Sequence, residues 1–144
     1  MLKKFAILAC SMLALLSCQT TGTQPHSNSK PHTLQGDWEF VSGRFTRADG
    51  TVSTADSSSL RSLKVIGASR FAFVTLRADG SLVKAAAGRY AISGNTYTEY
   101  IDLVTPGDAR GTTAVFTWRV EGDTWYHNGE GRGMKFDEVW RRAR

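Results

Sequence analysis

The feature that most constrains the fold is a series of short segments with alternating apolar and polar residues, each followed by a glycine-containing turn. A period of two places successive side chains on opposite faces of a β-strand. Ala48-Asp49-Gly50, Ala78-Asp79-Gly80, Ser93-Gly94-Asn95 and Glu121-Gly122-Asp123 are typical turns between antiparallel strands. The expected strands span residues 37–45, 61–66, 70–77, 81–92, 96–104, 112–120, 124–127 and 134–142.

These strands predict an all-β domain in which consecutive strands form an antiparallel up-and-down meander. No window has a helical period, and only residues 55–63 could hold a turn of helix, where serines could cap it. An open meander leaves unpaired edges, and closing it into a β-barrel of about eight strands removes them. We therefore expect residues 34–144 to form a single barrel domain.

Aromatic and aliphatic residues share one face of most expected strands, which predicts the side that points into the barrel. The residues expected to point inward are Trp38, Phe40, Phe71, Phe73, Tyr90, Ile92, Tyr97, Ile101, Phe116, Trp118, Val120, Met134, Phe136 and Trp140. Two interpretations remain open. Either these side chains fill the barrel as a solid core, or some of them line a cavity that opens at one end.

Three charged residues, Arg44, Glu99 and Glu138, share the inward face with those apolar residues. A buried carboxylate must pair with a cation, become protonated or lie at an opening. One interpretation is a structural ion pair, or a β-bulge that shifts the register. The other is a ligand site in which Arg44, Glu99 and Glu138, with Trp118, contact a polar or amphipathic molecule.

The N-terminus has the organisation of a secretory signal, with Lys3 and Lys4 ahead of an apolar run over residues 5–16. That run is shorter than the roughly 20 residues needed to span a bilayer. Leu15-Leu16-Ser17-Cys18 resembles the lipobox of bacterial lipoproteins. The resemblance implies removal of residues 1–17 and acylation of Cys18, palmitate being a typical acyl chain. The alternatives are a plain signal peptide, or one membrane-anchoring helix with incidental cysteines.

Residues 18–33 are polar and are expected to form a disordered, lipidated tether. Such a linker reaches on the order of 20 Å. By resemblance to lipoprotein sorting in Gram-negative bacteria, Gln19 after the cysteine implies the outer membrane, and we expect its periplasmic face. His26 and His32 lie in this tether and are not expected to bind metal.

Composition argues against several function classes. The net charge is +5, and it would be +3 without Lys3 and Lys4. The basic residues are scattered, so nucleic-acid binding is not expected. Catalytic motifs and phosphate-binding loops were not found, so we expect no enzyme, no cofactor and no metal. His127 could be a lone haem ligand, but an exposed or hydrogen-bonded histidine is the simpler interpretation. The oligomeric state is left open.

Gly36-Asp37-Trp38 opens the first strand, and Arg141-Arg142 follows Trp140 in the last. This pattern resembles the lipocalins, or calycins, in which a late arginine packs across the first tryptophan. Gly88-Arg89-Tyr90, residues 95–100 and residues 138–141 further resemble small bacterial lipocalin-like lipoproteins of unassigned function. Two functions follow as hypotheses. One is a barrel that binds a small apolar or amphipathic molecule; the other is a filled barrel that serves as a structural or interaction protein of the envelope.

Overall fold

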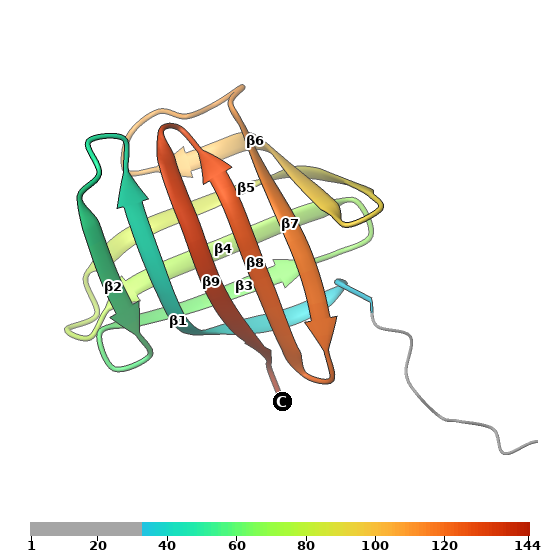
Figure 1. Ribbon diagram of the computed structural model, residues 1–144, viewed down its shortest axis with the longest axis horizontal. Helices are drawn as coiled ribbons and strands as arrows, with labels where there is room; N and C mark the ends of the chain where they lie inside the picture. The colour runs from blue at the N-terminus through green and yellow to red at the C-terminus, as the bar shows by residue number, and fades with distance from the viewer. Residues whose placement is uncertain (1–32) are drawn as a thin grey trace, which may run out of the picture.

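The computed structural model describes residues 33–144, which form a closed antiparallel barrel of eight strands with a ninth strand beside it (Figure 1). The strands are β1 (Gly36–Arg47), β2 (Val52–Asp56), β3 (Leu60–Ile66), β4 (Arg70–Arg77), β5 (Leu82–Ser93), β6 (Thr96–Thr105), β7 (Thr113–Glu121), β8 (Thr124–Gly131) and β9 (Met134–Arg142). Pairing of β9 with β1 closes the barrel. The expected signal peptide, Cys18 and residues 18–32 of the expected tether lie outside the described residues.

Strand β1 joins the two walls of the barrel. Gly36–Glu39 pairs with β3, Ser42–Thr46 pairs with β2, and both parts pair with β9 on the other side. The register against β9 shifts between Phe40 and Ser42, which marks a β-bulge. In Figure 1 the strand bends accordingly, from the wall of β3, β4 and β5 to the wall of β7, β8 and β9.

All eight expected strands are present, with bounds shifted by a few residues, and the expected barrel is confirmed. Strand β2 was not expected, and the proposed helical turn over residues 55–63 is wrong. The carboxylate of Asp56 accepts hydrogen bonds from the backbone amides of Ser58 and Ser59, at 2.9 and 3.2 Å. This side chain therefore closes a tight turn between β2 and β3 where a helix would have needed several residues. No helix of membrane-spanning length and hydropathy occurs within residues 33–144.

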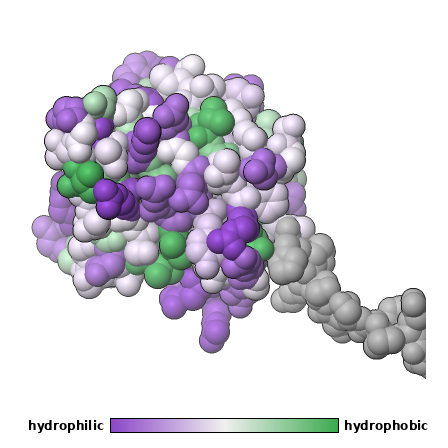
Figure 2. Space-filling model, viewed as in Figure 1, coloured by the Kyte–Doolittle hydropathy of each residue, from purple (hydrophilic) through white to green (hydrophobic). Residues whose placement is uncertain are grey.

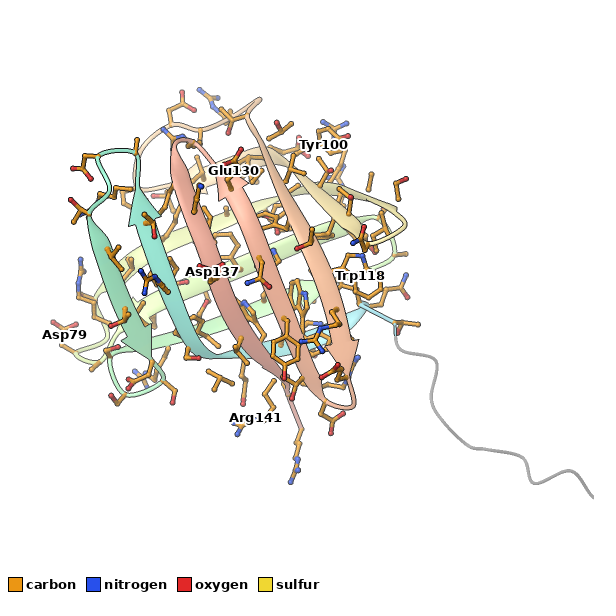
Figure 3. The ribbon with its side chains drawn as sticks, in the orientation of Figure 1. Asp79, Tyr100, Trp118, Glu130, Asp137 and Arg141 are labelled. Carbon is orange, nitrogen blue, oxygen red and sulfur yellow. The ribbon has the colours of Figure 1, made fainter. Side chains whose placement is uncertain are left out.

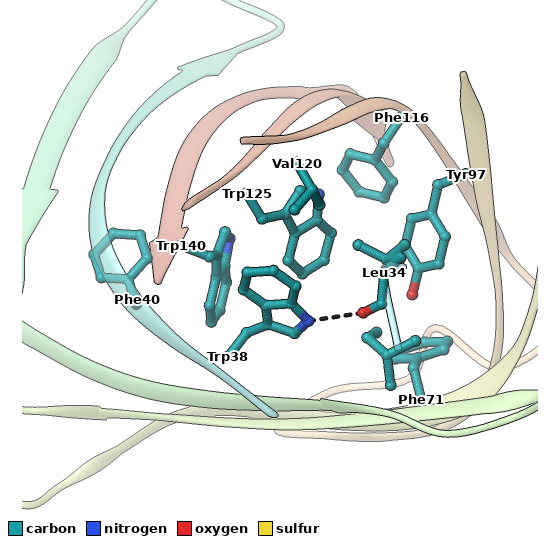
Figure 4. Packing of buried hydrophobic residues seen from close by; sticks show 10 residues of the cluster. Leu34, Trp38, Phe40, Phe71, Tyr97, Phe116, Val120, Trp125 and Trp140 are labelled. Carbon is teal, nitrogen blue, oxygen red and sulfur yellow. Dashed lines mark hydrogen bonds between the residues drawn. The ribbon is translucent and has the colours of Figure 1, made fainter. Parts of the chain in front are cut away.

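One end of the barrel is sealed by a cluster of buried aromatic side chains (Figure 4). The Trp38 and Trp125 rings meet edge to face, with centroids 5.3 Å apart, and both are fully buried. The Trp38 indole donates a hydrogen bond of 2.8 Å to the Leu34 carbonyl, so the chain folds over this end before β1 begins. Sequence reasoning had not placed Leu34 or Trp125 in the core.

Arg142 closes the same end from outside. Its guanidinium lies 4.3 Å from the centre of the Trp38 ring, and it donates hydrogen bonds of 2.9 Å to the carbonyls of Thr33 and Gln35. Gly36 has a φ of +132°, and a side chain there would overlap the Arg142 guanidinium. Glycine is therefore required at the start of β1. The arginine–tryptophan contact is the one that the lipocalin resemblance implies.

The opposite end of the barrel is formed by the turns around residues 48–50, 78–81, 106–111 and 132–133. The fully buried aromatic residues do not reach this end, and it remains hollow. At the sealed end, Ile92 has the expected inward parity, because it pairs with the buried Tyr97. It is nevertheless 43% exposed and is not part of the core, because it lies next to the turn that ends β5.

Candidate functional site

A cavity of about 470 Å³ occupies the hollow half of the barrel. Volumes of roughly 300–1,000 Å³ are typical of small-molecule sites. The walls are mainly apolar and include Phe40, Phe45, Leu60, Phe73, Val83, Ile101, Val104, Met134 and Phe136. Polar residues enter at two levels. One group lies midway along the strands, at the inner end of the cavity, and the other lies near the opening.

The inner group, here called the buried polar cluster, consists of Lys64, Glu99, His127 and Glu138. Lys64 Nζ lies 2.5 Å from Glu99 Oε1, and both side chains are 4% exposed. Such a pair is stable only when the mutual attraction offsets the loss of hydration. Tyr97 follows on the sealed side, where burial and then the charge of Glu99 raise the pKa of its hydroxyl. The tyrosine is therefore neutral.

Aromatic rings surround the Lys64 ammonium group. Its Nζ lies between 5.4 and 5.8 Å from the centroids of six rings, those of Phe71, Phe73, Tyr97, Phe116, Trp125 and Trp140. A cation near the face of an aromatic ring is attracted by the ring quadrupole, and the attraction grows when water is excluded. These rings and Glu99 together hold a positive charge inside the barrel.

A second buried pair lies beside the first. His127 Nδ1 is 2.8 Å from Glu138 Oε2, and the Trp140 indole donates to the same oxygen at 3.0 Å. A carboxylate only accepts hydrogen bonds, so the imidazole proton belongs on Nδ1. The imidazole also stacks on Phe116, with ring centroids 3.8 Å apart. The imidazole cannot turn without breaking its hydrogen bond to Glu138.

The charge state of this pair follows from its surroundings. Burial, and then the charge of Lys64, lower the pKa of His127, so its imidazole is neutral. For Glu138, burial alone would raise the pKa. The hydrogen bond from His127 and the charge of Lys64 outweigh burial, so the pKa of Glu138 is lowered and the group is ionised. Lys64 therefore lies near two carboxyl groups, of which Glu138 is ionised.

Two basic residues, Lys84 and Arg132, line the cavity nearer its opening. Lys84 is half-buried, and burial, followed by the charge of Arg132, lowers the pKa of its ammonium group. Within residues 33–144 neither side chain forms an ion pair. The positive charges near the opening are therefore available to an incoming molecule.

The structure brings together two of the four ligand-binding residues predicted from sequence. Glu99 and Glu138 both line the cavity. Arg44 does not, because the β-bulge after Phe40 turns its side chain outward and places Gly43 and Phe45 on the inner side. Trp118 does not line it either. It lies in the half of β7 that leads to the sealed end, partly buried against the core.

Sequence reasoning missed two members of the buried polar cluster, Lys64 and His127. His127 could have been found, because Trp125 is two residues earlier and therefore points to the same side of β8. Lys64 carries no such signal. Its neighbours Leu63 and Val65 are as apolar as Leu60 and Ile66 of the inner side, yet they face outward.

No family model matches the chain. No curated protein matches it either. Among solved structures it is similar to a de novo designed fluorescence-activating β-barrel. The identity is 18%, the match covers 76% of this chain and 93% of that chain, and the TM-score is 0.45. Within residues 33–144, no group of three or more His, Cys, Asp or Glu side chains is arranged to hold a metal ion.

Proposed function

We propose that this protein binds a small apolar or amphipathic molecule inside its barrel while Cys18 anchors it by lipid to the outer membrane, on the periplasmic face. The observation that carries the proposal is the cavity of about 470 Å³ at one end of a barrel whose other end is sealed. The proposal is of a binding protein and includes no chemical reaction. The lipobox resemblance at Leu15–Cys18 supports the anchor.

The cavity lining supports an amphipathic ligand. Contact with the apolar walls contributes about 25 cal/mol for each Å² of apolar surface removed from water. Polar groups then determine the orientation of the ligand. An anionic group would meet Lys84 and Arg132 near the opening, whereas a group with a hydrogen-bond donor would suit the carboxylates of the buried polar cluster. Few polar groups in an otherwise apolar pocket are typical of sites that select one ligand.

Kinship with the lipocalins is part of this proposal. It is supported by Gly36-Asp37-Trp38 at the start of the barrel and by Arg142 stacked on Trp38 at its end. A meander of eight antiparallel strands closed by β9 and β1 is consistent with it. Fold alone does not determine a ligand, so the ligand is proposed from the cavity and not from this kinship.

The first test is native mass spectrometry of the full chain purified from its own envelope. We expect a bound small molecule that is released on unfolding. The second test uses N-phenyl-1-naphthylamine, an uncharged apolar fluorophore. We expect saturable binding to the full chain, with competition by the molecule found in the first test. Absence of both signals would contradict the proposal.

A pair of variants on β2 tests whether the fluorophore binds in this cavity. Ser53 lines the cavity near its opening, while Thr54, the next residue, faces the other side of the strand. Ser53→Trp is expected to weaken binding of the fluorophore roughly tenfold if the indole displaces about 60 Å² of apolar contact. Thr54→Trp is the matched control and should leave binding unchanged. Equal affinities in the two variants would place the fluorophore outside this cavity.

A further inference from the structure

Strands β3, β4 and β5 are apolar on their outer surface as well as on the inner one. This apolar outer surface continues onto β6. Its outward residues are Leu63, Val65, Ala72, Val74, Leu76, Leu82, Ala85, Ala87 and Leu103, here called the outer apolar face. The five largest contributors, Leu63, Val65, Val74, Leu82 and Leu103, are between 39% and 65% exposed. An antiparallel sheet with one wet surface normally carries polar residues there. A contiguous apolar surface of this kind marks an interaction site.

Charge on this part of the barrel is mainly positive. Residues 57–78 and 80–98 contain no aspartate or glutamate. The exposed charged side chains carried by β3, β4 and β5 are those of Arg61, Arg70, Arg77 and Arg89. The neighbouring carboxylates are Asp79 in the turn after β4, Asp108 after β6, and Asp102 of β6, which is 3.3 Å from both Arg70 and Arg89. The outer apolar face is thus bordered by arginines whose charge exceeds that of the nearby carboxylates.

The opposite wall, formed by β7, β8 and β9, shows the contrast. Figure 2 shows this side with hydrophilic side chains spread over it and its apolar residues separated from one another. Glu130, Asp137 and Arg141, labelled in Figure 3, belong to this wall and are exposed. Charges of both signs alternate there, as is usual for a surface in contact with water. The outer apolar face is therefore a local feature of one side of the barrel.

We propose that the outer apolar face docks onto an anionic phospholipid surface. Basic residues around an apolar patch are the combination that binds the interface of such membranes. The apolar side chains enter the region between headgroups and acyl chains, and the arginines contact the phosphates. This inference rests on the proposed lipid anchor, which would keep the barrel within the reach of its tether from a membrane.

A groove in this face supports a lipid partner. It has a volume of about 620 Å³ and passes over β4, β5 and β6, where Ala72, Ala85 and Ala87 leave room between larger residues. Leu103 borders it, and Asp108 and Arg110 line its margin, where they pair with each other at 3.2 Å. Because the alanines hollow the surface, an acyl chain can lie along it.

Charge argues against a second copy of this chain as the partner. In a two-fold symmetric contact the same surface is presented by both copies. Such a contact would bring two sets of the four arginines together, while on each face Asp102 is the carboxylate that pairs with Arg70 and Arg89. Like charges brought together across an interface oppose association. An anionic membrane supplies the missing negative charge.

The test locates the outer apolar face relative to the bilayer. The full chain carrying Leu103→Trp is mixed with vesicles of phosphatidylcholine alone, or of phosphatidylcholine with phosphatidylglycerol, each containing brominated acyl chains. Leu103 is 65% exposed, so the substitution does not disturb the core. We expect the added fluorescence, relative to the wild-type chain, to be quenched in anionic vesicles. Val115→Trp, on the outer surface of β7, is the matched control and should not be quenched.

The arginines are tested by charge reversal in the Leu103→Trp chain. Arg61→Glu with Arg77→Glu should abolish quenching, since each arginine near an anionic surface contributes roughly a fivefold gain in membrane partitioning. Arg44→Glu with Arg47→Glu makes the same charge change on β1, away from the face, and should leave quenching intact. An equal loss of quenching in both double variants would show that the arginines around the outer apolar face have no special role in membrane binding.

The remaining outcomes separate this inference from the proposed anchor. If the chain binds both kinds of vesicle but the fluorescence of Leu103→Trp is not quenched, the outer apolar face does not contact the membrane. The proposed lipid anchor is then unaffected. If the chain binds neither kind of vesicle, both ideas fail. A stable dimer in vesicle-free solution that is disrupted by Leu103→Asp, or capture of an acidic protein in place of lipid, would also overturn membrane docking.

Discussion

At the scale of single residues, the buried polar cluster is the unusual part of the molecule. Lys64 and Glu99 lie in a barrel interior where a lone charge is strongly disfavoured, so each depends on the other. His127 and Glu138 are coupled in the same way through one hydrogen bond. These residues line the cavity, so their energetics affect both folding and any bound molecule.

The first prediction concerns the Lys64–Glu99 pair. Lys64→Met should lower the free energy of unfolding by about 3–5 kcal/mol, because Glu99 is left buried without a partner. Adding Glu99→Leu should restore most of that loss, since the double variant removes both members of the pair. Urea unfolding followed by circular dichroism measures both. If the double variant is as unstable as the sum of its single changes, the pair is not coupled.

The second prediction concerns the pH dependence of stability. An unfolded histidine titrates near pH 6.5, whereas burial lowers the pKa of His127 in the fold. Below about pH 6.5 the unfolded chain therefore binds a proton that the folded chain does not. Stability should fall as the pH is lowered from there, by at most about 1.4 kcal/mol per pH unit.

His127→Gln should remove the loss of stability that is expected just below pH 6.5. Glu138→Gln should retain it, because Glu138 raises the pKa of His127 and its removal only lowers that pKa further. Glu138 itself has a lowered pKa, so its contribution to stability is present above about pH 4.5 and is lost only as the pH falls further. Identical pH profiles for wild type and His127→Gln would contradict the assignment.

Alternation explains why part of this site was predictable. Glu99 lies between Tyr97 and Ile101, and Glu138 lies between Phe136 and Trp140, so neighbours of the same parity indicate that both point inward. Lys64 was not predictable because β3 is apolar on its outer side as well. A strand with two apolar sides gives no indication of which one faces the interior.

At the scale of elements, irregularities in strand pairing determine which side chains face the cavity. The bulge in β1 reverses the parity after Phe40, so Arg44 is outside and Phe45 inside. No proline or unusual residue spacing in the sequence indicates this bulge. Strand β2 was also unpredictable, since Val52–Asp56 lacks an apolar face of its own and pairs in the sheet only with β1.

The third prediction concerns a second register shift, between Ala87 and Gly88 where β5 meets β6. A side chain at Gly88 would collide with the backbone carbonyl of Tyr100. Gly88→Ala should therefore destabilise the barrel by about 1–3 kcal/mol through overpacking. Gly94→Asn is the control, because the turn at Gly94 is open and asparagine tolerates its positive φ of 58°. Thermal unfolding of both variants measures the difference, and equal midpoints would contradict it.

At the scale of the whole molecule, the barrel has a filled half and a hollow half. The strand count and the closure of the barrel follow from turn chemistry and alternation, which is why they were predictable. The position of the cavity was not. Aromatic residues of the same parity occur in both halves, and only the three-dimensional packing of Trp38, Tyr97 and Trp125 shows which half they fill.

The fourth prediction is an uneven pattern of amide hydrogen exchange. Amides of β8 and β9 near Trp125 and Trp140 should exchange only through global unfolding, because they surround the filled half. Amides of β2, which is mostly exposed and flanks the barrel, should exchange through local opening. Exchange measured by mass spectrometry with increasing urea distinguishes the two. Protection of β2 equal to that of β9 would contradict this division.

Arg142 and the backbone beside it bring the two ends of the described chain together. Arg142 bonds to Thr33 and Gln35, and the amide of Ala143 donates to the Asp37 carbonyl at 2.8 Å. Anything fused after β9 is therefore held at the sealed end, next to the segment that leads back to Cys18. A fluorescent protein or purification tag placed there leaves the mouth of the cavity unobstructed, so ligand uptake can be followed on the tagged protein in living cells.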